Sequence, residues 1–321
     1  AARGGILRRG LAIPLADAAV VSNLSVDHFG EYGIHDLEAL ADVKLTVGRA
    51  VRRGGLLVVN ADDALLARKA PAVGSRLGWF ALDHSHPLLL AHREHGGATA
   101  GVADGKLILC GEGEAFDLGA VADMPIAQQG ASPHNVANLA AAALAARALG
   151  VSPDVIATVL ARFGADPADN PGRLMRYEVG GIKLLVDFAH NPAALRGVLT
   201  VAQQLRAGGR LGLLLGQAGN RRDDDLRGLA TVAAEFRPDL VVLKELADYL
   251  RGRADGEVTA LLRAALIDAG VAGQAIAGAP GEIAAVRLAL DWARPGDVLV
   301  LLVHTRAGRS ETLELIDRLR G

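Results

Sequence analysis

Residues 184–192 read Leu-Leu-Val-Asp-Phe-Ala-His-Asn-Pro, an apolar run that ends in an acid, a histidine and an amide before a proline. Buried parallel strands read as continuous apolar runs, and proline is favoured in the first turn of a helix. In open α/β sheets, ligands lie beyond the carboxyl ends of the strands. The stretch therefore predicts a strand-to-helix turn that places Asp187, His190 and Asn191 at a ligand crevice. The competing interpretation is an ordinary turn in which Asn191 or Asp187 only caps the helix.

The region around this stretch alternates apolar runs with helical patterns. Strands are expected at residues 184–187, 211–215, 240–243 and 298–303, and helices at residues 193–206, 226–236, 257–269 and 283–293. Such alternation predicts a mostly parallel sheet, covered by helices on both faces and joined by right-handed crossovers. We therefore predict a Rossmann-like domain over residues 171–321.

The preceding residues have the pattern of a second α/β unit. Strands are expected at residues 17–23 and 56–60, and helices at residues 35–53, 61–69, 135–149 and 154–163. Glycine-punctuated segments in residues 75–118 indicate small antiparallel strands added to the main sheet. Turn-forming residues concentrate in residues 165–172, Ala-Asp-Pro-Ala-Asp-Asn-Pro-Gly, and mark a linker. The predicted domains are residues 1–170 and 171–321.

The composition limits the classes of function. Of the 321 residues, 51% are hydrophobic but only 3% are aromatic, so both cores should be aliphatic. A net charge of -2 offers no electrostatic case for a nucleic-acid or anionic-membrane partner. Cys110 is the only cysteine, which excludes a disulfide framework or a cysteine zinc site and fits a cytoplasmic location. The apolar runs are far shorter than the roughly 20 residues that cross a bilayer.

Two polar groups follow the first expected strand. Residues 23–33, Asn-Leu-Ser-Val-Asp-His-Phe-Gly-Glu-Tyr-Gly, place Asp27 and His28 in a loop at its carboxyl end, where a histidine can ligate a divalent cation. The alternative is a hydrogen-bonded loop element. Lys44 lies on or beside the apolar face of the next helix, and the more common explanation of such a lysine is snorkelling.

Three further segments carry candidate binding residues. Asn135 and Asn138 lie three apart at the start of a helix, so they could share one face and read a base edge, or Ser132 or Asn135 could simply cap the helix. Residues 216–225, Gly-Gln-Ala-Gly-Asn-Arg-Arg-Asp-Asp-Asp, combine glycines with two arginines that suit phosphate or carboxylate. The arginines of residues 251–253 could also bind an acidic group, although a solvated loop is the commoner outcome.

The order and spacing of these segments resemble the Mur ligase superfamily, and within it the ligase half of the cyanophycin synthetase branch. The resemblance runs from end to end and rests on residues 2–11 (Ala-Arg-Gly-Gly-Ile-Leu-Arg-Arg-Gly-Leu), 23–33, 59–63 (Val-Asn-Ala-Asp-Asp), 134–138 (His-Asn-Val-Ala-Asn), 171–173 (Pro-Gly-Arg), 187–192, 220–223 (Asn-Arg-Arg-Asp) and 251–257. It implies a central ATP-binding domain over residues 1–170, truncated at its N-terminus, and a C-terminal Rossmann-like domain over residues 171–321.

The resemblance also implies a chemistry. ATP phosphorylates a carboxylate, and an incoming amine attacks the acyl phosphate to give an amide, with ATP and Mg2+ as cofactors. His28 resembles the metal ligand and Lys44 the lysine that is often carbamylated beside it. The other implied roles are adenine contacts for Asn135 and Asn138, hinge and ribose contacts for Arg173 and Asp187, a position near the phosphates for His190 and Asn191, and binding of the amino acid or phosphoryl group for Arg221 and Arg222.

The sequence departs from the family pattern in one large respect. No Gly-x-x-x-x-Gly-Lys-Ser/Thr loop, which would cradle the phosphates, occurs in it. In the family this loop precedes the position that matches Ala1, so we expect the chain to be the C-terminal part of a longer ligase. The alternatives are a degenerate, non-catalytic binding protein and another Mur-type ligase, of peptidoglycan or folylpolyglutamate. The expected partners are a small-molecule amino acid, a peptide or polymer acceptor and possible copies of the chain itself.

Overall fold

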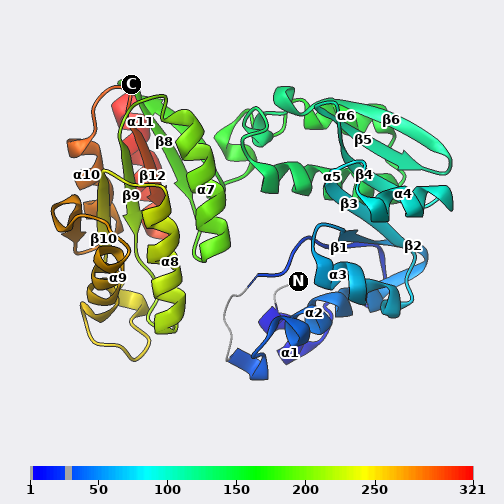
Figure 1. Cartoon of the computed structure of the whole chain (residues 1–321), viewed down its shortest axis with the longest axis horizontal. Helices are drawn as coiled ribbons and strands as arrows, with labels where there is room; N and C mark the ends of the chain where they lie inside the picture. The colour runs from blue at the N-terminus through cyan, green and yellow to red at the C-terminus, as the bar shows by residue number, and fades with distance from the viewer. Residues whose placement is uncertain (1–2, 26–30, 321) are drawn as a thin grey trace. The chain divides into compact units, whose positions relative to one another are not determined.

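The computed structural model describes residues 3–25 and 31–320 (Figure 1). The chain divides into two compact units, Ala1–Ala165 and Asp166–Gly321, each with its own six-stranded sheet. Each unit is described below by itself.

The first sheet is mostly parallel. Its strands lie in chain order: β1 (Ala16–Val21), β2 (Val51–Asn60), β3 (Leu77–Asp83), β4 (Ala98–Ala103), β5 (Lys106–Gly111) and β6 (Glu114–Ala120). Strands β1 to β4 pair in parallel, whereas β5 and β6 are added as antiparallel hairpins. The expected mostly parallel sheet with a small antiparallel addition is therefore confirmed.

Helices cover both faces of this sheet because consecutive residues of a strand point to opposite sides. Leu56 and Val58 of β2 join the core beneath α5 (Pro133–Ala148), which packs across strands β1 to β5. Leu57 and Val59 face the opposite core. The remaining helices of the unit are α1 (Arg3–Arg9), α2 (Leu37–Leu45), α3 (Ala64–Lys69), α4 (Pro87–Glu94) and α6 (Pro153–Leu160).

The predicted helix over residues 35–53 was wrong in its second half. Helix α2 ends at Leu45, a 3-10 turn follows over Thr46–Ala50, and β2 begins at Val51. The apolar residues that suggested one long helix belong instead to this turn and to the start of β2. In the turn, Gly48 packs so closely against Leu57 that a Cβ would lie 2.8 Å from the Leu57 Cδ2.

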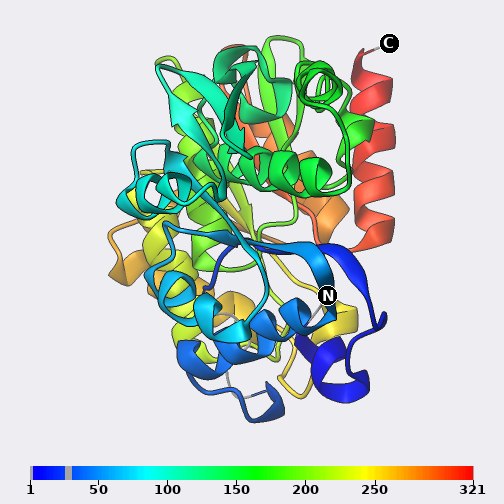
Figure 2. The same ribbon diagram turned by 90° about the vertical axis from the view of Figure 1, so that its right-hand side faces the viewer.

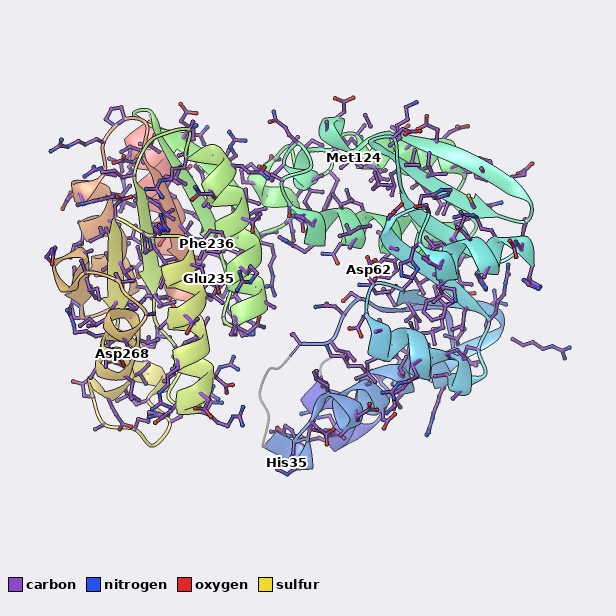
Figure 3. The ribbon with its side chains drawn as sticks, viewed as in Figure 1. His35, Asp62, Met124, Glu235, Phe236 and Asp268 are labelled. Carbon is purple, nitrogen blue, oxygen red and sulfur yellow. The ribbon has the colours of Figure 1, made fainter. Side chains whose placement is uncertain are left out.

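The interpretation of residues 75–118 as antiparallel strands was also only partly right. Strands β3 and β4 are parallel, and helix α4 connects them. Proline at the first position and the His86 side chain at the N-cap, which accepts from the Leu88 amide, begin this helix. Met124 and Asp62 of this unit are labelled in Figure 3. Met124 is buried in the core, and Asp62, which follows β2, accepts from the Leu82 amide at 2.8 Å.

The second sheet has the order β11-β10-β9-β12-β8-β7. Its strands are β7 (Met175–Val179), β8 (Ile182–Asp187), β9 (Leu211–Leu215), β10 (Leu240–Lys244), β11 (Ile276–Ala279) and β12 (Val298–Leu302), of which only β7 is antiparallel to its neighbour. The helices are α7 (Pro192–Leu205), α8 (Asp223–Glu235), α9 (Glu257–Asp268), α10 (Glu282–Trp292) and α11 (Arg306–Arg320). The predicted Rossmann-like arrangement is confirmed, although β7, β11 and α11 were not anticipated.

The second unit has a reversal of strand order at its centre. Strands β8, β9 and β10 lead into α7, α8 and α9 on one face, whereas β11 and β12 lead into α10 and α11 on the other (Figures 1 and 2). Strand β12 lies between β8 and β9. Because the chain leaves neighbouring strands toward opposite faces here, the carboxyl ends of β8, β12 and β9 flank the crevice position of an open α/β sheet.

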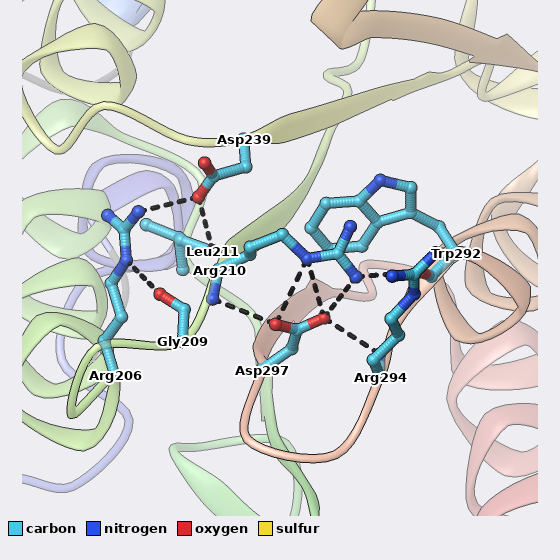
Figure 4. A network of polar contacts seen from close by, with 8 residues as sticks. All are labelled: Arg206, Gly209, Arg210, Leu211, Asp239, Trp292, Arg294 and Asp297. Atoms are coloured by element: carbon cyan, nitrogen blue, oxygen red, sulfur yellow. Dashed lines mark hydrogen bonds and ion pairs between the residues drawn. The ribbon is translucent and has the colours of Figure 1, made fainter.

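The opposite, amino edge of this sheet is tied together by carboxylates. Asp297, just before β12, accepts from the backbone amides of Arg210 at 2.9 Å and Arg294 at 2.8 Å, and from the Arg210 guanidinium at 2.6 Å (Figure 4). Asp239, just before β10, accepts from the Leu211 amide at 2.8 Å.

Among the helices of the described residues, none is both long enough and apolar enough to span a bilayer.

Candidate active site

Asp187 ends β8 and binds the turn that follows it. Its two carboxylate oxygens accept from the backbone amides of Leu174 and Ala189, each at 2.6 Å. Burial raises the pKa of the Asp187 carboxyl, although these hydrogen bonds and the nearby Arg173 oppose the shift. Asp187 therefore joins the segment that enters the second unit to the carboxyl end of β8.

The next residues of the turn combine capping with a polar side chain. Asn191 is the N-cap of α7, where its side-chain oxygen accepts from the Ala194 amide at 2.9 Å, and the proline after it begins the helix. The capping role weighed for Asn191 is therefore confirmed. His190 is half-buried, and its Nδ1 lies 3.1 Å from the Phe188 carbonyl oxygen, so this nitrogen donates. The Arg173 guanidinium lies 5.3 Å from the centre of the Phe188 ring.

The glycine-rich turn after β9 is held by contacts with residues 250–253. A Cβ on Gly219 would lie 1.8 Å from the Leu250 carbonyl oxygen, so only glycine fits there. The Arg253 guanidinium donates to the carbonyl oxygens of Gly219 at 2.9 Å and Arg221 at 2.7 Å, and to Asp223 at 2.7 Å. The Arg-Gly-Arg segment thus supports the turn through Arg253, whose side chain is only 16% exposed, and the expectation of a solvated loop was wrong for this residue.

The two arginines of that turn differ in their surroundings. Arg221 is buried, at 8% exposure, whereas Arg222 is exposed and pairs with Asp225 at 3.2 Å. Arg222 is also the N-cap position of α8, which has three aspartates in its first turn. These aspartates suit the helix dipole, as the sequence indicated.

Gln217, in the same turn, has an unsatisfied polar atom. The side chain is 3% exposed, and its Nε2 has no hydrogen-bond partner within the part of the chain that the structure describes. A buried donor without an acceptor costs roughly 1–3 kcal/mol unless a ligand or water satisfies it. This amide is therefore a group that a bound ligand could engage.

A buried group of charged and polar residues lies beside the turn after β8, and we call it the Lys244 cluster (Lys244, Glu282, His304 and Thr305). Lys244 ends β10 with a completely buried side chain that pairs with Glu282, the first residue of α10. Glu282 also accepts from the backbone amides of His304 at 2.6 Å and Thr305 at 3.0 Å and from the Thr305 hydroxyl. The cluster joins the carboxyl ends of β10 and β12.

The electrostatics of the Lys244 cluster favour one charge distribution. Burial by itself would raise the pKa of the Glu282 carboxyl, but the Lys244 ammonium and the hydroxyl and amide donors lower it overall. Burial, with the Lys244 charge, lowers the pKa of His304 to about 3. Burial also lowers the pKa of the Lys244 ammonium, and the Glu282 carboxylate opposes this shift. The direct pairing of Lys244 with Glu282 therefore carries the assignment of an ion pair beside an uncharged imidazole.

In the first unit, Lys44 points back toward the end of β1. Its ammonium donates to the Asn23 carbonyl oxygen at 3.0 Å, and its side chain is half-buried. Asp27 and His28 lie outside the residues that the structure describes. Within those residues, no group of three His, Cys, Asp or Glu side chains could hold a metal ion.

The two asparagines at the start of α5 differ in their exposure to solvent. Asn135 is buried at 7% exposure, and its Nδ2 donates to the Ile126 carbonyl at 2.9 Å, whereas Asn138 is exposed. The N-cap of α5 is Ser132, which makes no side-chain capping bond. An internal carbonyl thus uses the Asn135 donor, whereas the Asn138 amide is exposed, and the joint reading of a base edge by the two residues stays a prediction.

The second unit thus gathers five of the ten candidates at one edge of its sheet. Asp187, His190 and Asn191 follow β8, and Arg221 and Arg222 follow β9. Sequence reasoning missed Gln217 and the Lys244 cluster. The signal was available for two of these residues, since Lys244 and His304 each follow an apolar run as Asp187 does.

Two family models match the chain. The Mur ligase middle domain matches residues 9–146, and the Mur ligase glutamate ligase domain matches residues 172–302. A cyanophycin synthetase of Trichormus variabilis is 34% identical over 261 residues, which are 81% of this chain and 29% of that protein. A cyanophycin synthetase of Geminocystis herdmanii is 33% identical over 267 residues, covering 83% and 30%. The chain spans about 30% of the length of these curated relatives.

Solved structures share the fold. The E. coli FolC complex with DHPP and ADP has a TM-score of 0.67 at 19% identity, over 95% of this chain and 63% of that one. A murein peptide ligase from Psychrobacter arcticus has a TM-score of 0.61 at 20% identity, over 96% and 58%. Two domain models in the family order, relatives at one-third identity and a common fold agree. The chain therefore belongs to the Mur ligase family, of which it carries the middle domain and the glutamate ligase domain.

Proposed function

We propose that this chain is part of an ATP-dependent ligase that forms an amide bond between a carboxylate and an amino acid through an acyl phosphate, as in the cyanophycin synthetase branch. The observation that carries the proposal is the carboxyl edge of the second sheet, where polar turns follow β8, β9 and β12 at the reversal of strand order. The two matched domains and the cyanophycin synthetase relatives support it. A cytoplasmic location, where ATP is available, accompanies the proposal.

The proposed domains are a middle, ATP-binding domain over residues 1–170 and a C-terminal Rossmann-like domain over residues 171–321. In the first, Lys44 would act beside the metal, and Asn135 and Asn138 would contact adenine. The exposed Asn138 amide supports its part directly, whereas Asn135 would help by holding the start of α5 through Ile126.

In the second domain, Arg173 and Asp187 would form the hinge and ribose contacts, and the hydrogen bond from Leu174 to Asp187 supports a hinge role. His190 and Asn191 would lie near the phosphates. Arg221 and Arg222 would bind the incoming amino acid or the phosphoryl group, because guanidinium groups match carboxylate and phosphate oxygens.

ATP would supply the phosphoryl group that activates the carboxylate, and catalysis of such a transfer depends mainly on positioning and charge neutralisation. For Mg2+, the proposed ligand His28 lies outside the described residues, and the described ones offer no ligand set of their own. The proposal for Mg2+ therefore rests on the family and on the ATP chemistry.

The test is an amide-ligation assay on the protein as its gene encodes it, with ATP, Mg2+, an acceptor carboxylate and a panel of amino acids. We expect phosphate release that requires both substrates, and an acyl phosphate that hydroxylamine traps as a hydroxamate. Replacing Lys44 or His28 should abolish ligation, because each is proposed to lie at the metal. ATP-independent product, or normal turnover in these variants, would contradict the proposal.

A second candidate is a ligase-like protein that binds a ligand without catalysis, for which the buried Gln217 amide, unsatisfied within the described residues, is a candidate contact. Calorimetric titration of the 321-residue chain with ATP bears on it. We expect weak or undetectable binding by the chain itself, and micromolar affinity would contradict this expectation. Ligation by the gene product would exclude the non-catalytic candidate. The amino acid and the acceptor that react would then distinguish the proposed ligase from peptidoglycan and folylpolyglutamate ligases.

A further inference from the structure

His304 in the Lys244 cluster touches the turn that carries two of the proposed site residues. Its Nε2 lies 3.0 Å from the Ala189 carbonyl oxygen, and its Nδ1 lies 3.5 Å from the Lys244 Nζ. A carbonyl only accepts and an ammonium only donates. Both contacts therefore require the same neutral tautomer, with the proton on Nε2.

Lys244 is held so that it can impose this tautomer. Its ammonium is paired with Glu282, whose carboxylate also accepts from His304 and Thr305, so neither partner of the ion pair can turn away without leaving buried charge. The lysine stem passes beneath Gly216, where a Cβ would lie 2.6 Å from the Lys244 Cγ and 2.4 Å from its carbonyl oxygen. The glycine after β9 is thus needed for the lysine at the end of β10 to reach the cluster.

The turn after β8 is held on both sides of Ala189. Asp187 accepts from the Ala189 amide at 2.6 Å, and His304 donates to the Ala189 carbonyl. The Phe188 ring lies edge-on to the rings of both His190, at 5.2 Å, and His304, at 5.4 Å. A displacement of the His304 ring would therefore move the backbone from which His190 and Asn191 project.

We propose that His304 is a positioning residue: the Lys244–Glu282 pair holds its imidazole as the neutral Nε2–H tautomer, and the ring fixes the Ala189 carbonyl so that His190 and Asn191 project in one geometry. The tautomer and the fixed turn stand on contacts within the second unit. Their use in catalysis rests on the proposed ligase function.

The experiment compares two amide variants that each keep one half of the imidazole. His304→Gln places an amide near the Nε2 position and keeps a donor for Ala189, whereas His304→Asn reaches only the Nδ1 position. Long-range proton–nitrogen NMR of wild-type imidazoles should show the neutral Nε2–H tautomer of His304 from pH 8 to pH 5. Hydrogen exchange at the Ala189 amide should be about tenfold faster in His304→Asn, because the turn opens more readily once the hydrogen bond to the Ala189 carbonyl is lost, and near wild type in His304→Gln.

Exchange at Leu213 and Val242, in the central strands, is the internal control and should change in neither variant. A general loss of stability would instead accelerate these amides as well. A His304 that titrates near its ordinary pKa, an Nδ1–H tautomer, or equal exchange at Ala189 in both variants would overturn the proposal.

Ligation kinetics of the same variants then test the catalytic part. We expect a roughly tenfold lower kcat in His304→Asn with little change in the KM for ATP, and recovery in His304→Gln. These results separate the two proposals, since the NMR and exchange measurements use no substrate. If the tautomer and the exchange pattern are as predicted but the protein has no ligase activity, the proposed function is wrong and the positioning role of His304 remains. If both variants have the wild-type kcat, His304 has no role in catalysis.

Discussion

The two edges of the second sheet both carry dense polar networks, but they are built differently. At the amino edge, Asp297 is paired with Arg210, whose side chain is 35% exposed and whose guanidinium lies 3.9 Å from the centre of the Trp292 ring. At the carboxyl edge, Lys244 is completely buried with Glu282. One set of strands, about five residues or roughly 16 Å long, separates the two networks.

The difference indicates which edge is built for stability alone. The carboxylate of Asp297 binds the backbone amide just before β9, a second amide in the turn after α10, and an arginine that solvent partly hydrates (Figure 4). At the carboxyl edge, the buried Gln217 amide has no partner among the described residues, and an uncharged imidazole touches a loop. Unsatisfied and tightly held groups of this kind serve a ligand site better than they serve stability.

The largest expected effect is at the carboxyl edge. Lys244→Met keeps the apolar stem but leaves Glu282 as a buried charge without its cation, so the free energy of unfolding should fall by about 3–5 kcal/mol. Urea denaturation followed by circular dichroism measures this change. The double variant with Glu282→Gln should be less destabilised than the sum of the single variants. A loss below about 1 kcal/mol in Lys244→Met would show that the pair is less desolvated than its burial indicates.

At the amino edge, Asp297→Asn should cost less, about 2–3 kcal/mol, because the amide oxygen still accepts from one of the two backbone amides while the charge that binds Arg210 is lost. Trp292 fluorescence reports unfolding beside this network. The matched control is Glu235→Gln, which breaks an exposed pair with Arg196 and should leave the urea midpoint unchanged. A shift of the His190 NMR signals in Asp297→Asn would contradict the independence of the two edges.

The pH dependence should distinguish the two edges. His304 has a pKa of about 3 when folded, so between pH 6.5 and pH 3 the unfolded chain binds a proton that the folded chain does not. Stability should therefore fall with decreasing pH by about 1.4 kcal/mol per unit in this window, and His304→Gln should lack this component.

The pKa of Asp297 is also lowered, but from a lower starting value, so its effect on stability appears at a lower pH. Burial would raise it, but the hydrogen bonds from Arg210 and Arg294 lower it below its ordinary value of 3.8. Its contribution to stability is present above that value and is lost only as the pH falls through the folded pKa. Equal slopes for wild type and His304→Gln between pH 6.5 and 4.5 in urea denaturation would show that His304 does not carry the acid sensitivity.

The smallest expected effect is that of Gln217→Leu. Removing a buried donor without a partner should leave the free energy of unfolding unchanged or raise it by up to about 1 kcal/mol. The same variant should weaken substrate binding in the ligation assay. Destabilisation by more than about 1 kcal/mol would show that the amide has a structural partner, and the isosteric Gln217→Glu variant would then report on its charge tolerance.

Much of the second domain was predictable because its strands are buried on both faces and read as apolar runs. The turn of Asp187 and Asn191 was predicted by the same pattern, and the cap at Asn191 was confirmed. The first unit was harder, because the spacing of Val47 and Val51 is compatible with a helix and with the 3-10 turn and strand that form there. Short apolar segments are ambiguous between these periods.

The candidate site was only partly predictable for a related reason. A residue's place at a strand end follows from local pattern, but its partners come from strands that are neighbours only in the folded sheet. The Lys244 cluster joins residues 38 and 60 positions apart, and Arg253 braces a turn about 30 residues before it. Asn135 illustrates the converse, because its donor is taken by a carbonyl that spacing along α5 does not reveal.

The sequence alone determined the family, the α/β class and which residues end the strands, because periodicity and turn chemistry are local properties of the chain. The tertiary structure decided which of those residues contact one another. Strand order brings Lys244, Glu282 and His304 into contact in a buried cluster. Burial there keeps the imidazole neutral, and its contacts select one tautomer. Burial and pairing of charge depend on neighbours in space, and a linear pattern does not contain them.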